Sequence, residues 1–77
     1  MNDIQKRVMF SHKAFYTNDI NLLTEVIKTN LNTMEAHLDD YSNADDFWLL
    51  EKINHELVNK RDKLHNERMA EREKTNQ

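Results

Sequence analysis

The first candidate for chemistry is the stretch 55–59, His-Glu-Leu-Val-Asn, which resembles the zinc-protease pattern. That pattern needs a second histidine four residues after the first, so that two imidazoles share one helix face, and this chain has Asn59 there. Glu51 lies one helical turn before His55, but two ligands are too few for a metal site. We therefore expect Glu51 and His55 to form a stabilising or merely solvated pair.

The second candidate is a run of acidic residues in the middle of the chain, which invites comparison with a calcium-binding loop. A loop of about twelve residues that starts at Asp40 would end at Glu51, as an EF-hand loop does. However, Asp45 stands where that loop requires glycine, and Trp48 occupies a ligand position. The pattern instead favours an acidic turn, followed by a helix with Asp45 and Asp46 in its first turn.

The composition removes most other kinds of site, because the chain contains no glycine, proline or cysteine. Without glycine it lacks the usual phosphate-binding loop, and without cysteine it has neither disulfides nor thiolate metal ligands. No serine, histidine and aspartate can be assigned to one catalytic arrangement. We therefore predict that the protein is not an enzyme and uses no cofactor and no metal.

The same absence of glycine and proline predicts an all-α fold, since those residues supply most tight turns and helix stops. We expect a short N-terminal helix plus an antiparallel helical hairpin with an extended, charged C-terminal helix. The expected elements are helices over about 3–16, 19–40 and 43–72, one domain over 1–72 and a frayed tail over 73–77.

Polar side chains must make both breaks between these helices. Residues 17–19 and 39–43 consist almost entirely of Thr, Asn, Asp and Ser, which compete locally for backbone hydrogen bonds. Asn2 or Asp3 is expected to cap the first helix, and Ser42 the third.

Apolar residues at helical spacing predict which faces are buried. The first helix has a loose face of Ile4, Val8, Met9, Phe15 and Tyr16. The second has a regular stripe of Ile20, Leu23, Ile27, Leu31, Met34 and Leu38, widened by Leu22 and Val26. The third has Phe47, Trp48, Leu50, Ile53, Leu57, Val58 and Leu64. After Val58 this stripe thins, so the end of the third helix is expected to be either solvated or an arm that docks on a partner.

Charge is distributed unevenly along the chain, whose net charge is −3. Residues 1–58 contain five basic and ten acidic residues, whereas residues 59–77 contain six basic and four acidic ones. An acidic body argues against direct binding to nucleic acid, which usually needs a clear basic face. No apolar run approaches the length of a membrane span or forms a signal peptide, so we expect a cytoplasmic protein.

Binding to another protein is the function that these exclusions leave. We predict a small helical adaptor or inhibitor, of a type often encoded by phages or other mobile elements, and self-association through the second and third helices is also expected. The expected partner-binding residues are Trp48, Phe47, Tyr41, Asp45, Asp46 and Leu64. The alternative is an acidic mimic of nucleic acid that occupies a DNA-binding protein through Glu35, Asp39, Asp40, Asp45 and Asp46.

Two blocks of the sequence resemble a known family of small helical regulators. Residues 20–27 and 41–45 are similar to the second helix and the Tyr-Ser-Ala-Ala-Asp signature of the Hha/YmoA family. The blocks lie closer together here, and Asp-Phe-Trp follows at 46–48, where that family has a His-Arg pair. The resemblance implies a modulator whose partner is a nucleoid-associated protein of the H-NS type.

Overall fold

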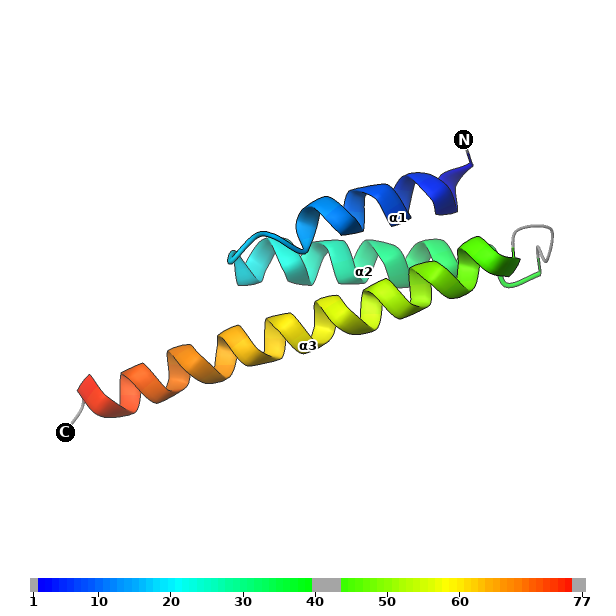
Figure 1. Cartoon of the computed structure of the whole chain (residues 1–77). Coiled ribbons are helices and arrows are strands. Elements are labelled where there is room, and N and C mark those ends of the chain that lie inside the picture. Colours follow the sequence, from blue (N-terminus) through cyan, green and yellow to red (C-terminus); the bar gives the residue numbers. More distant parts are fainter. Residues whose placement is uncertain (1, 40–43, 76–77) are drawn as a thin grey trace.

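The computed structural model describes residues 2–39 and 44–75, which form three helices (Figure 1). These are α1 (Asp3–Ala14), α2 (Ile20–Ala36) and α3 (Ala44–Thr75). The described residues contain no strand. The predicted all-α fold, a short N-terminal helix with a helical hairpin and a long C-terminal helix, is therefore confirmed.

The three helices pack against one another over the first half of α3 (Figure 1). The molecule is elongated, with extents of 55 × 20 × 16 Å, because α3 continues past the turn between α1 and α2. Residues 65–73 are all exposed on this projecting part of α3. The helix reaches Thr75, one turn beyond the predicted end at residue 72, and its good helix formers account for that continuation.

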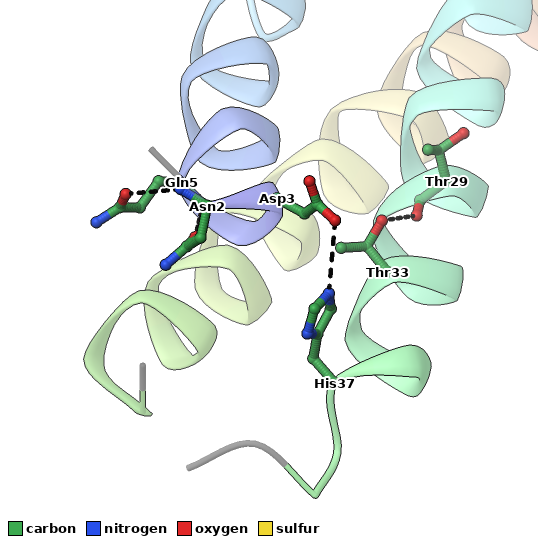
Figure 2. Close-up of polar contacts among 6 residues, drawn as sticks. All are labelled: Asn2, Asp3, Gln5, Thr29, Thr33 and His37. Carbon is green, nitrogen blue, oxygen red and sulfur yellow. Dashed lines mark hydrogen bonds and ion pairs between the residues drawn. The ribbon is translucent and has the colours of Figure 1, made fainter. Parts of the chain in front are cut away.

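Asn2 caps α1, which confirms the first of the two predicted caps, Asn2 or Asp3. Its side-chain oxygen accepts a hydrogen bond from the Gln5 backbone at 2.8 Å, and the Gln5 side chain accepts one from the Asn2 backbone at 3.2 Å (Figure 2). This reciprocal pair is a capping box, which satisfies two backbone donors that the helix leaves unpaired.

The turn between α1 and α2 is made without any left-handed residue, as a chain lacking glycine requires. No described residue has a positive φ. Phe15 keeps right-handed helical angles, and Asp19 is extended and caps α2 by accepting hydrogen bonds from Asn21 at 2.9 Å and Leu22 at 3.2 Å. The predicted break at 17–19 is therefore confirmed, with Asp19 preceding the helix instead of beginning it.

Helix α2 ends at Ala36, earlier than the predicted end at residue 40. Two physical causes act against the last turn. Leu38 is 56% exposed and so gains little from packing there, and Asp39 would add negative charge at the negative end of the helix dipole. The predicted cap Ser42 lies outside the described residues.

Polar contacts join the three helices where α1 and α3 begin and α2 ends. Asp3 of α1 lies 3.9 Å from His37 at the end of α2, a contact that becomes an ion pair when the histidine is protonated (Figure 2). Gln5 donates a hydrogen bond of 3.1 Å from its side-chain amide to the Asp46 carboxylate of α3.

The hydrophobic core differs from the predicted faces on α1 and α2. Of the apolar residues predicted for the inner face of the first helix, Met9 is exposed on α1, and Phe15 and Tyr16 are exposed just beyond the end of α1. Leu31 on α2 is exposed too, because the buried face of that helix is rotated to bring Asn30 inside. The buried apolar residues are Ile4, Val8, Ala14, Leu23, Val26, Ile27, Met34, Leu50, Ile53 and Leu57.

Asn30 is the hub of a polar cluster at the centre of the bundle. Its side-chain nitrogen donates to Ser11 Oγ at 2.8 Å and to Asn54 Oδ1 at 3.1 Å, so one amide joins all three helices. Its oxygen accepts from Arg7 Nε at 2.8 Å, and partial burial lowers the pKa of Arg7. Among the described residues, no buried side-chain nitrogen or oxygen lacks a hydrogen-bond partner. A satisfied cluster of this kind favours one register of the three helices over others.

Candidate protein-interaction groove

An apolar groove runs between α2 and α3. One side is formed by Leu31 of α2 and by Leu38, which follows that helix. Phe47, Trp48 and Val58 line the α3 side, and the volume of the groove is about 510 Å³. Contiguous exposed apolar surface is more informative than a single exposed leucine, because it commonly marks an interaction site.

Three of the groove residues are unusually exposed for their type. Leu31 is 53% exposed, Leu38 is 56% exposed and Trp48 is 64% exposed. None of them contributes to the buried core, so their burial is available to stabilise a complex.

Helical spacing places these residues in two rows. Leu31 and Glu35 lie one turn apart on α2, and Leu38 lies in the turn that follows this helix. Trp48 and Glu51 lie about one turn apart on α3. Two adjacent rows of side chains make an elongated groove, which is the shape that accommodates an amphipathic helix.

Phe47 positions Trp48. The Phe47 ring is half-buried and packs against the core, and successive helical residues point about 100° apart. The two rings are in edge-to-face contact, with centroids 6.0 Å apart and planes at 84°. Trp48 is thereby held at the rim of the groove with most of its surface exposed.

The carboxylates that line the groove give it a negative charge. Glu35 of α2 and Glu51 of α3 line it together with His55, and no lysine or arginine is among the described residues that do so. The Glu51 and His55 side chains therefore belong to the wall of this groove. The described part of the chain contains no group of three or more histidine, aspartate or glutamate residues that could hold a metal ion.

The structure separates the six predicted partner-binding residues. Phe47 and Trp48 lie in the groove, whereas Asp45 is exposed in the first turn of α3, and Asp46 accepts the hydrogen bond from Gln5. Tyr41, another of the six, lies outside the described residues.

Leu64, the remaining predicted residue, does not line the groove. It lies about 9 Å along α3 beyond Val58, the last α3 residue of the groove, at 1.5 Å per residue. There it packs against the core and lines a separate pocket with Phe15 and Lys60. The Lys60 ammonium donates to the Phe15 carbonyl oxygen and lies 5.0 Å from the centre of the Phe15 ring, so it fastens the end of α1 to α3. The contacts of Leu64 are those of a packing residue.

The sequence prediction missed Leu31, Leu38, Glu35 and Glu51 as groove residues. The two leucines were assigned to the core because they continue the regular stripe of α2. The available signal was the alternative series Leu23, Val26, Ile27, Asn30 and Met34, which also has helical spacing but includes a polar residue.

None of the described helices combines the length and the apolar character that a membrane span requires. Comparisons with protein-family models, with curated proteins and with solved structures find no match to this chain. The resemblance of residues 20–27 and 41–45 to the Hha/YmoA family stays a prediction. Any functional conclusion therefore depends on the groove and its charges.

Proposed function

We propose that this protein is a non-enzymatic regulator, an adaptor or inhibitor, that binds another protein in the α2–α3 groove. The observation that carries the proposal is the joint exposure of Leu31, Leu38 and Trp48 on one continuous surface. The proposal includes action in the cytoplasm and an origin in a phage or another mobile element, both from the composition.

Physical chemistry supports the groove as the energetic centre of such an interface. Covering apolar surface contributes about 25 cal/mol per Å² before the costs of association are counted. Tryptophan is among the residues that most often dominate binding energy, especially where neighbouring side chains exclude water from it. Trp48 is mostly exposed in the free protein, and it lines the groove together with Leu31, Leu38 and Phe47, which a bound partner would cover with it.

Affinity capture with the full chain as bait tests this function. Wild-type protein should retain a partner that the Leu31→Ser variant loses, because a hydroxyl group in the groove removes apolar contact. The matched control is Leu22→Ser, since Leu22 is an exposed leucine of the same helix that does not line the groove. A partner retained equally by both variants, or no partner in stoichiometric amount, would refute the proposal.

The acidic mimic of nucleic acid is the second candidate, and the position of the acidic residues favours it. Asp3 and Asp45 are exposed in the first turns of α1 and α3, and Asp39 is exposed three residues after the end of α2. An Hha-like modulator of a nucleoid-associated protein is a separate alternative, based on the resemblance of residues 20–27 and 41–45. The partner of the acidic mimic would be a DNA-binding protein, and binding would weaken strongly between 50 mM and 500 mM salt. Binding that is insensitive to salt would exclude the mimic.

A further inference from the structure

We propose that the occupant of the α2–α3 groove is a basic amphipathic helix of the partner protein. This inference depends on the proposed function and adds the chemical class of the partner segment. It follows from the combination of apolar lining, acidic flanks and helical dimensions in one groove.

The charges of the groove favour a cationic partner. Glu35 and Glu51 come from different helices, so they flank the apolar surface from both sides. Lysine or arginine side chains beside the apolar stripe of a docked helix would lie close to both carboxylates. An acidic helix would place like charges together, which is unfavourable in a partly desolvated interface.

A second copy of this chain fits the groove less well. In a two-fold dimer the same surface meets itself, so both copies of Glu35 and Glu51 would enter one interface without any groove lysine or arginine. The projecting part of α3 is no better an occupant, because its apolar side chains from residue 65 to residue 73 are only Met69 and Ala70. Neither a two-fold contact of the groove with itself nor residues 65–73 of α3 therefore complements the groove.

The dimensions of the groove indicate the length of the partner segment. From Trp48 to Val58 its α3 wall extends about 15 Å, which corresponds to roughly ten helical residues or three turns. A helix of that length has apolar residues at i, i+3 or i+4, and i+7 along one face. The predicted partner segment combines this stripe with lysine or arginine on its flanks.

Two designed peptides and one natural fluorophore test the inference. The probes are a 14-residue leucine–lysine amphipathic peptide and a leucine–glutamate peptide with the same leucine positions. Trp48 is the sole tryptophan of the chain, so its emission reports occupation of the groove directly. The leucine–lysine peptide should shift this emission to shorter wavelength and saturate, with the leucine–glutamate peptide binding at least tenfold more weakly.

Charge-neutralising variants show whether the attraction is local. Replacing both groove acids, Glu35→Gln with Glu51→Gln, should weaken the leucine–lysine peptide about 5- to 20-fold, which is a few-fold for each ion pair. The matched control Glu25→Gln should bind normally, because Glu25 is exposed on α2 but does not line the groove. Equal weakening by the control would show only general attraction to an acidic protein and would overturn the inference.

The remaining outcomes distinguish failure of the basic-helix inference from failure of the proposed protein-binding function. Equal binding of the two peptides, or no shift of Trp48 emission with either, overturns the basic helix. A partner captured through Leu31 would still uphold the proposed function in that case. Sedimentation that shows a dimer disrupted by Leu31→Ser would assign the groove to a second copy and would also overturn the inference.

Discussion

Adjacent residues on α2 reverse the usual distribution of polar and apolar groups. Asn30 is 0% exposed at the centre of the bundle, whereas Leu31 is 53% exposed in the groove. The buried amide is tolerated because it has hydrogen-bond partners on both other helices. The exposed leucine gains nothing comparable in the free protein. The inner face of α2 thus specifies the fold, and its outer face is available for binding.

The largest expected effect comes from removing a side chain on the inner side of α3. Leu50 is fully buried, so Leu50→Ala should lower the free energy of unfolding by about 2–5 kcal/mol. Trp48→Ala, although it deletes more atoms, should change the free energy by less than about 0.5 kcal/mol, since Trp48 is mostly exposed. Urea denaturation followed by circular dichroism measures both. Equal losses would mean that the groove also stabilises the fold.

The next effect concerns the polar centre. Asn30→Ala leaves Ser11 and Asn54 without their shared donor, and should cost about 1–3 kcal/mol. Asn32→Ala on the same helix is the matched control, because Asn32 is exposed, and it should be close to neutral. The comparison is made by urea denaturation of both variants. A neutral Asn30→Ala would show that the cluster is dispensable.

A smaller effect is expected at the capping box of α1. Asn2→Ala removes the side-chain acceptor for the Gln5 backbone and should cost about 1 kcal/mol. Asn18→Ala, in the exposed turn before α2, serves as the control and should cost less. Thermal denaturation of the two variants ranks them, and a reversed order would contradict the assigned cap.

The smallest effect is expected from the projecting end of α3. Truncation after His65 removes residues 66–73, which are all exposed, so the free energy of unfolding should change by less than about 0.5 kcal/mol. The helical signal in circular dichroism should fall by the share of helix removed. A large loss of stability would instead show that this segment packs on the bundle, and loss of peptide binding would show that it contributes to the binding surface.

Much of the fold could be predicted because local chemistry decides it. Asn2 is followed three residues later by Gln5, the spacing of a capping box, and Asp19 directly precedes the apolar stripe of α2, where a side-chain cap is expected. Asn2 was predicted as a helix cap, and Asp19 belongs to the predicted break at residues 17–19. The exposure of Trp48 could be anticipated because adjacent helical residues point about 100° apart, so Phe47 and Trp48 cannot both enter the core, and its role in binding stays a prediction.

The rest depended on packing among three helices. Two overlapping stripes over residues 20–38 have helical spacing: one includes Leu31 and ends in Leu38, beyond α2, and the other passes through Asn30. Hydrophobicity alone favours the first, whereas the fold uses the second because Ser11 and Asn54 complete the hydrogen bonds of Asn30. Which stripe is buried depends on side chains of α1 and α3, which a pattern within α2 does not reveal. The position of the groove depends on the same choice, so it could not be predicted either.

A ¹H–¹⁵N NMR titration with the leucine–lysine peptide tests most directly whether the outer face of α2 binds while the inner face only folds. We predict that the indole N–H of Trp48 and the amides of residues 31–38 and 47–58 shift and saturate together. The signals of residues 65–73 and of the Asn30 side chain should stay in place. Shifts concentrated in residues 65–73, with Trp48 unmoved, would contradict the account.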